Sequence, residues 1–151
     1  MALAAFRKEK TMSAEDNKRL ARQFFAEVDK KSVDGLGEYL APGFLAHPPG
    51  VPQPLNGEMF QQMLASFSAG FPDYSHTIES QVAEGNKVVC RVSFQGTQTG
   101  NFQGIPPTGK PVSISEIHVM RLEDNRIAEY WAVFDSLGML QQLGLAPGPG
   151  Q

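Results

Sequence analysis

The sequence has little of what marks secreted, membrane or nucleic-acid-binding proteins. Cys90 is its one cysteine, so no disulfide can form within the chain. It has no apolar run near the roughly 20 residues that a membrane-spanning helix needs. Its net charge of −3 offers no basic surface to nucleic acid or to an anionic bilayer. We therefore expect no nucleic-acid or membrane partner and, with a single thiol and no secretory signal pattern, a cytoplasmic protein.

Patterns that bind metals or cofactors are also missing. The three histidines, His47, His76 and His118, do not have the spacing of a known metal-ligand signature. His76 alternates with Ile78 as in an ordinary strand. There is no glycine-rich phosphate loop and no Gly-x-Ser-x-Gly motif. We expect neither a metal nor an organic cofactor.

What the sequence does contain is typical of one folded domain. An apolar fraction of 41% and a charged fraction of 19% over 151 residues are ordinary for a globular protein. The ends are less regular, because the N-terminus holds a basic cluster and the C-terminus is rich in proline and glycine. We expect a flexible extension over 1–12, a single domain over 13–145 and a flexible tail over 146–151.

The first half of the chain carries helical patterns. Ser13 and Asp16 form a capping-box pattern ahead of apolar residues at helical spacing, which predicts a helix that ends near Lys31. A short helical piece follows over 34–40. The proline-rich stretch 44–52 predicts a loop without regular hydrogen bonds.

A third helix is predicted after this loop, with Asn56 as its cap and Gly70 near its end. The second half then changes to strand patterns and a last short helix, predicted over 75–84, 87–98, 112–122, 126–134 and 136–143. Helices followed by antiparallel strands predict an α+β fold. We expect a cone-shaped barrel, in which N-terminal helices pack on a curved, mixed, mainly antiparallel sheet and enclose a pocket for a small apolar molecule.

The last predicted hairpin defines the candidate site. Asp124-Asn125 is typical of a two-residue turn, which pairs Leu122 with Ile127 and His118 with Trp131. Because opposed residues share a face, the pocket face then collects Glu116, His118, Met120, Glu129, Trp131 and Asp135. The other face is apolar, and we expect it to form a homodimer contact through Ile117, Val119, Tyr130, Ala132 and Phe134.

Four ionisable groups on the pocket face allow two interpretations: Glu116, His118, Glu129 and Asp135. As a catalytic set, they would line a water-poor pocket and move protons. As structure, they would form a satisfied polar network in the core. Two classes of function follow. One is an acid/base enzyme that acts on a small apolar carbonyl or ester substrate; the other is a non-catalytic module that binds a small molecule or dimerises.

Several motifs together resemble one known family. They are Phe71-Pro72-Asp73-Tyr74, the loop Gly104-Ile105-Pro106-Pro107-Thr108-Gly109-Lys110, and Glu129-x-Trp131-x3-Asp135. In this order and spacing they resemble the SnoaL-like polyketide (ester) cyclases, within the superfamily of nuclear transport factor and ketosteroid isomerase. The resemblance covers about residues 14–145 and implies the cone-shaped fold.

The resemblance also implies a reaction: intramolecular aldol closure of an aromatic polyketide ester, without metal or organic cofactor. It places the general acid/base on Asp135. The shared pocket face adds His118, as a hydrogen-bond donor to the developing oxyanion, and Glu129 to the expected catalytic set. The residues expected to hold the substrate are His47, Trp131, Glu116, Met120 and Phe60. The same groups could instead support an isomerisation, a dehydration or a hydrolysis, because a shared fold does not fix the reaction.

Overall fold

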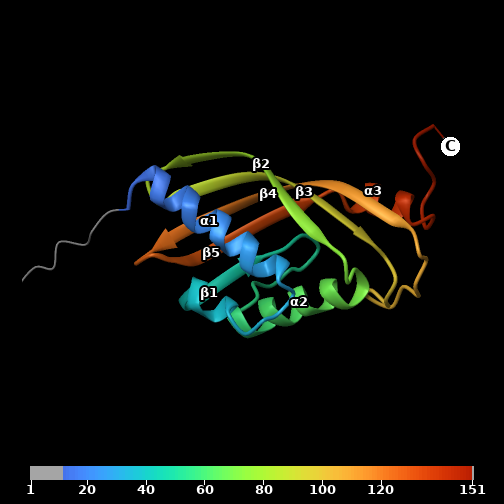
Figure 1. Ribbon diagram of the computed structural model, residues 1–151, viewed down its shortest axis with the longest axis horizontal. Coiled ribbons are helices and arrows are strands. Elements are labelled where there is room, and N and C mark those ends of the chain that lie inside the picture. The colour runs from blue at the N-terminus through green and yellow to red at the C-terminus, as the bar shows by residue number, and fades with distance from the viewer. Residues whose placement is uncertain (1–11, 151) are drawn as a thin grey trace, which may run out of the picture.

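The computed structural model describes residues 12–150 and has one five-stranded sheet at its centre, which is curved (Figure 1). Its elements are α1 (Ala14–Asp29), the 3-10 helix η1 (Leu36–Tyr39), β1 (Leu40–His47), α2 (Gly57–Gly70), β2 (Ser75–Glu84), β3 (Lys87–Thr97), β4 (Pro111–Glu123), β5 (Arg126–Phe134) and α3 (Ser136–Gln142). The strand order is β1-β5-β4-β3-β2. β1 runs parallel to β5 and the other pairs are antiparallel. The predicted α+β class and mixed sheet are confirmed.

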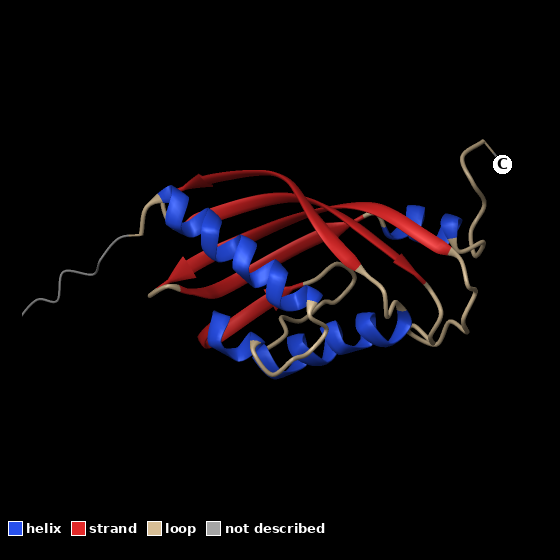
Figure 2. Ribbon diagram, viewed as in Figure 1, coloured by secondary structure: helices blue, strands red, loops and turns tan. Residues whose placement is uncertain are grey.

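The sheet stays open, with β1 and β2 as its edges, and helices α1 and α2 lie along the same side of it (Figure 2). Between them and the sheet is an aromatic core, in which the rings of Phe24 and Phe60 stack with centroids 6.4 Å apart. Burying each large apolar side chain contributes about 1.5–3 kcal/mol. The short helix α3 follows β5 and is joined to β4 by two hydrogen bonds between the Gln142 side chain and the Ser113 backbone. The sheet therefore has a covered inner face and an outer face.

Both long helices begin where the sequence predicts. The Ser13 hydroxyl accepts a hydrogen bond from the Asp16 amide at 3.1 Å, and the Asp16 carboxylate accepts one from the Ser13 amide at 3.4 Å. Asn56 caps α2 by accepting from the Met59 amide at 2.9 Å. These caps satisfy backbone donors that the first turn of a helix leaves free. None of the helices in residues 12–150 is both long and apolar enough to cross a membrane.

The sequence predicts a flexible segment at each end of the chain. The predicted extension over 1–12 lies outside the described residues except for Met12. In the predicted tail, the Pro147 carbonyl accepts a hydrogen bond from the Gln141 side chain at 2.8 Å. The limits of a single domain over 13–145 stay a prediction.

The loop predicted over 44–52 is wrong in its first part, because β1 continues to His47. Ala46 exchanges two backbone hydrogen bonds of 2.9 Å with Leu55, and its strand pairs with β5. The loop is predicted because the stretch is rich in proline, and proline is rare in regular strands. Pro42 falls where the pairing of β1 with β5 is irregular, so its missing N–H breaks no regular ladder bond.

A bulge in β5 overturns the predicted register of the last hairpin. Leu122 pairs with Ile127 as expected, but Arg121 then pairs with Glu129, so Ala128 is an extra residue. His118 consequently lies opposite Ala132 and not opposite Trp131. Because side chains alternate, every β5 residue beyond the bulge changes face.

The change of face exchanges two predicted sets. Tyr130, Ala132 and Phe134, expected on the dimer face, lie on the inner face instead. Glu129 and Trp131, expected in the pocket, lie on the outer face. A hairpin bulge of one residue is the physical reason for both corrections.

Candidate active site

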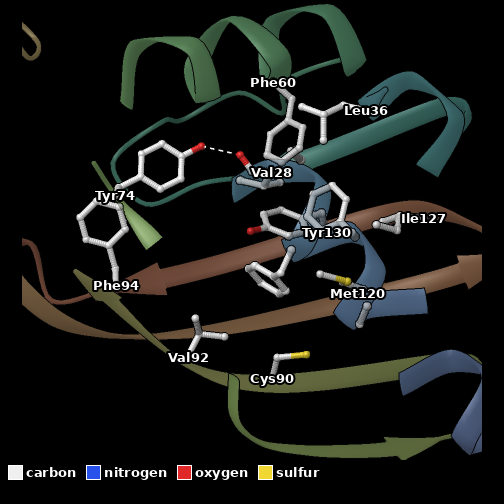
Figure 3. Packing of buried hydrophobic residues seen from close by; sticks show 14 of the residues in the cluster. Val28, Leu36, Phe60, Tyr74, Cys90, Val92, Phe94, Met120, Ile127 and Tyr130 are labelled. Atoms are coloured by element: carbon white, nitrogen blue, oxygen red, sulfur yellow. Dashed lines mark hydrogen bonds between the residues drawn. The ribbon is translucent and has the colours of Figure 1, made fainter. Parts of the chain in front are cut away.

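A narrow pocket lies between the inner face of the sheet and helices α1 and α2. Its open space is about 50 Å³, and it is lined by Phe24, Phe25, Val28, Pro48, Pro49, Met63, Leu64, Phe67, Tyr74, His76, Phe94, Glu116, His118, Tyr130, Ala132 and Phe134. Figure 3 shows part of this packing, with Tyr74, Phe94 and Tyr130 reaching from different elements toward the same space. The lining is mostly aromatic, so its few polar groups stand out.

Three of these polar groups form a buried hydrogen-bonded row on the floor of the pocket. Nε2 of His118 lies 2.7 Å from Oε2 of Glu116, and Nδ1 of His118 contacts the hydroxyl of Tyr130. Their exposed fractions are only 5% for His118 and Tyr130 and 6% for Glu116. The row joins β4 to β5 across the strand pair that the bulge re-registers.

Tyr130 fixes the direction of the hydrogen bonds along this row. Burial raises the pKa of Tyr130 well above its usual value, and the nearby Glu116 charge raises it further. Tyr130 therefore keeps its proton, and Nδ1 of His118 is the one acceptor that its hydroxyl reaches among residues 12–150. His118 then carries its own proton on Nε2 and donates it to the Glu116 carboxylate.

A second histidine–carboxylate pair faces the same pocket. Nδ1 of His76, on β2, lies 2.6 Å from Oδ1 of Asp29 at the end of α1. Asp29 also accepts the His76 backbone N–H at 3.0 Å. Nε2 of His76 lies 3.8 Å from Oε2 of Glu116, beyond hydrogen-bond distance. The pocket thus holds two histidines, His118 and His76, one on each side of the Glu116 carboxylate.

The alternation pattern does not place His76 in the pocket, because β2 also contains a bulge. A regular hairpin through Gly85-Asn86 would pair His76 with Gln95 and turn its ring outward. Glu79 is an extra residue in the β2–β3 pairing, so His76 pairs with Phe94 and faces inward. No alternation pattern in the sequence marks this shift.

Asp135, the expected general base, is not in the pocket. It is exposed at the start of α3, where its carboxylate accepts a hydrogen bond from the Gly138 amide at 2.8 Å. This is the geometry of a helix N-cap. The predicted inward placement of Asp135 is wrong, since it was inferred from the unbulged register.

Three further candidates gather on the outer face of the sheet. Nε2 of His47 lies 2.7 Å from Oε2 of Glu129, and the His47 ring stacks on Trp131 with centroids 5.4 Å apart. The hydrogen bond from His47 lowers the pKa of Glu129, and Arg121 adds to the effect from 3.5 Å. His47, Glu129 and Trp131 therefore form a cluster of their own, separated from the pocket by the sheet.

The last two candidates belong to the core. Met120 is fully buried and Phe60 is 1% exposed, and neither lines the pocket. Phe60 packs against the pocket residue Tyr130, with ring centroids 5.1 Å apart. Their contribution to the site is through packing behind Tyr130. Of the eight candidates, Glu116 and His118 alone line the pocket.

Other hollows and clusters carry less chemistry. A larger groove of about 500 Å³ lies between α2 and the η1–β1 segment, and Glu58 is the one ionisable group in its described lining. Within residues 12–150, no group of three or more His, Cys, Asp or Glu side chains is arranged to hold a metal ion. The inner pocket is therefore the candidate active site.

Comparison with known proteins gives consistent results. The family model for SnoaL-like polyketide cyclases matches residues 19–143. The aklanonic acid methyl ester cyclase DnrD of Streptomyces peucetius is 33% identical over 108 residues, 71% of this chain and 72% of the relative. The nogalonic acid methyl ester cyclase of Streptomyces nogalater is 28% identical over 115 residues, 74% of this chain and 85% of the relative.

Solved structures share the fold. IdmH of Streptomyces antibioticus, a candidate polyketide cyclase, superimposes with a TM-score of 0.78 at 29% identity, covering 85% of this chain and 98% of that one. AclR of Streptomyces galilaeus, a candidate hydroxylase, gives a TM-score of 0.82 at 24% identity over 90% of this chain and 89% of that one. The second likeness concerns the fold alone.

Proposed function

Because this chain belongs to the SnoaL-like polyketide cyclase family, we propose that it closes a ring in a polyketide ester by acid/base catalysis inside the inner pocket, without a cofactor. The observation that carries the proposal is the buried carboxylate of Glu116. Its Oε2 is bound by His118, while Oε1 has no hydrogen-bond partner among residues 12–150. A buried, half-satisfied carboxylate in an apolar pocket is a group typical of proton transfer.

The proposed ring closure needs a base, two carbonyl groups in one substrate molecule and a proton for the alkoxide. Oε1 of Glu116 removes a proton from a carbon beside a carbonyl group, and the electron pair left on that carbon attacks a second carbonyl carbon of the same molecule. A C–C bond forms, and the second carbonyl oxygen becomes an alkoxide that takes up a proton. His118 holds Oε2 of Glu116, and Tyr130 holds His118, so the base keeps one orientation.

The substrate class follows from the relatives and the lining. Two relatives are cyclases of the methyl esters of aklanonic acid and nogalonic acid, and we propose that this chain acts on a methyl ester of an aromatic polyketide acid. Aromatic side chains such as Phe25, Phe67 and Phe94 suit flat rings. Ligand pockets for drug-sized molecules usually hold about 300–1,000 Å³. The pocket must therefore open from its present 50 Å³.

The wall from α2 is the part best suited to move. Met63, Leu64 and Phe67 are only partly buried, and methionine in particular repacks at low cost. Opening at this wall leaves Glu116 and His118 on the sheet undisturbed. A substrate could then enter without breaking the hydrogen bonds of the pocket floor.

The proposal includes a homodimer that forms through the outer face of the sheet. Leu45, Ile117 and Val133 expose 40%, 38% and 61% of their surface there, beside Trp131. Exposed apolar patches of this kind usually meet a partner. A cytoplasmic location is also part of the proposal, and Cys90 supports it as a buried free thiol.

The test is an assay with aklanonic acid methyl ester and nogalonic acid methyl ester. We expect the protein to convert at least one of them to a cyclised isomer of unchanged mass. Glu116→Gln should lower turnover by about two orders of magnitude or more, because the amide cannot accept the proton. Glu129→Gln is the matched control, since Glu129 is also bound by a histidine at 2.7 Å but lies on the outer face.

Normal turnover by the Glu116→Gln variant would contradict the assignment of the base. Binding of both esters without turnover by the unmodified protein would instead favour a non-catalytic small-molecule-binding module. Calorimetry of ester binding separates these two outcomes, because it does not depend on turnover.

A further inference from the structure

We propose that His76 is a second catalytic group of the pocket, which gives a proton to the new alkoxide, and that Asp29 positions it. This inference rests on the ring closure proposed above and identifies the proton donor that the reaction requires. His76 comes from β2, an edge strand of the sheet, and Asp29 is the last residue of α1.

The ring of His76 is held in one orientation. Asp29 binds both its Nδ1, at 2.6 Å, and its backbone N–H, at 3.0 Å. Aromatic rings surround it, with centroids 5.4 Å away for Phe25, 5.3 Å for Tyr74 and 5.5 Å for Phe94. The side chain is 10% exposed. A base or acid oriented by a carboxylate on its far nitrogen is a recurrent catalytic arrangement.

The two pocket histidines differ in which nitrogen is available. His118 has both nitrogens engaged, one by Tyr130 and one by Glu116. His76 has Nδ1 engaged by Asp29, while Nε2 has no hydrogen-bond partner among residues 12–150. Nε2 of His76 is therefore the imidazole nitrogen that can bind a substrate oxygen.

The charges around the ring suit a proton donor. The titratable groups packed around His76 are Asp29 from α1, Tyr74 ahead of β2, and Glu116 and His118 from β4. Two of them are carboxylates, one beside each ring nitrogen. A protonated ring is thus paired with a negative charge on either side.

The complete cycle balances. Glu116 takes the proton from carbon, the new C–C bond uses the electron pair of the broken C–H bond, and the π pair of the attacked carbonyl moves to its oxygen. That oxygen takes the proton from Nε2 of His76. The proton on Oε1 of Glu116 then returns to Nε2 of His76 through the product hydroxyl, which accepts one proton as it donates the other. Both groups return to their starting states, and no proton is lost or gained overall.

The first test measures the ring nitrogens directly and needs no substrate. The chain has three histidines, so its imidazole nitrogen spectrum is simple and can be assigned with single variants. We expect Nδ1 of His76 to carry a proton, because it faces the Asp29 carboxylate. A His76 ring whose single proton lies on Nε2 and not on Nδ1 would overturn the proposal.

The second test separates proton removal from ring closure with aklanonic acid methyl ester in deuterated water. We expect His76→Gln to catalyse exchange of the acidic C–H within about threefold of the unmodified protein, and ring closure to fall about a hundredfold. His47→Gln is the matched control, because His47 also pairs with a carboxylate at 2.7 Å but lies on the outer face. It should change neither rate.

The positioning role of Asp29 is tested by kcat and by the tautomer of His76, which a purely structural role of Asp29 would not change. Asp29→Asn retains an oxygen for the backbone N–H of His76 but offers an N–H to Nδ1, which forces the other tautomer. We expect a tenfold or greater loss in kcat for closure with little change in KM, together with a proton shifted to Nε2. An Asp29→Asn variant with normal kcat would refute the positioning role.

The outcomes also distinguish this inference from the function on which it rests. If the unmodified protein catalyses neither exchange nor closure, the proposed function fails. If it catalyses both and His76→Gln closes the ring at the normal rate, or loses exchange and closure equally, His76 is not the donor while the proposed function stands.

Discussion

The hydroxyl of Tyr130 and Nδ1 of His118 are in hydrogen-bond contact, with both side chains almost completely buried. Through this contact, Tyr130 on β5 determines which ring nitrogen of His118 on β4 carries the proton. Since Glu116 is bound by the other nitrogen of that ring, the carboxylate and the phenol act on each other through His118.

The raised pKa of Tyr130 predicts an alkaline loss of stability. A folded-state pKa above the unfolded value of about 10 means that the stabilisation is complete below pH 10 and is lost as pH rises toward the folded pKa. We expect the free energy of unfolding to fall above pH 10 by up to about 1.4 kcal/mol per pH unit from this residue. Denaturant unfolding at a series of alkaline pH values measures it. Tyr130→Phe should show a shallower decline, and equal slopes would contradict the prediction.

Asp135 should behave as a helix cap. Asp135→Asn keeps an oxygen for the Gly138 amide, so we expect stability and turnover to stay close to those of the unmodified protein. Asp135→Ala removes the cap and should cost about 0.5–2 kcal/mol of unfolding free energy. Thermal melts and the ester assay measure the two effects. A hundredfold loss of turnover in the Asn variant would restore the catalytic role first expected for Asp135.

The pocket should prefer esters to free acids. In the described part of the chain, its lining contains the carboxylate Glu116 but no Lys or Arg that could pair with a substrate carboxylate. Placing a second negative charge beside Glu116 is unfavourable in an apolar site. We expect aklanonic acid to bind at least tenfold more weakly than its methyl ester at neutral pH. Titration calorimetry with both compounds decides it, and equal affinities would show that the carboxylate stays outside the pocket.

A charge on the outer face should dissociate the proposed dimer. Val133→Lys places an ammonium on the exposed apolar surface, next to Ile117, and we expect the dimer to dissociate at least tenfold more readily. Leu137→Lys is the control, because Leu137 on α3 is exposed to a similar degree, 59% against 61% for Val133. Sedimentation of the three proteins at micromolar concentration gives the result. A monomeric unmodified protein would refute the dimer.

The fold could be read from the sequence because its signals are local. Caps at Ser13 and Asn56 and the turns at Gly85-Asn86 and Asp124-Asn125 mark element boundaries within a few residues of where the chain puts them. The positions of these elements then follow from ordinary layer packing.

The site could not be read in the same way, because it depends on two bulges. Beyond Ala128, both faces of β5 are apolar: Tyr130 and Phe134 lie inward, and Trp131 and Val133 lie outward. Because neither face of β5 is polar, the alternation pattern does not show which face is buried and fits either register equally well. What selects the register is tertiary packing against α1 and α2, which a local pattern does not contain.

The bulge at Ala128 also means that a backbone irregularity, and not the letters of the motif, decides what the pocket contains. If β5 paired with β4 without the bulge, Glu129 would lie opposite Met120, so Glu129 and Trp131 would turn inward and Tyr130 outward. Deletion of the Ala128 codon would instead remove the extra residue and leave Glu129 opposite Arg121, so every later side chain would keep its face. Two homologues that differ in this bulge can therefore share every letter of the Glu-x-Trp motif and still present it to opposite sides of the sheet.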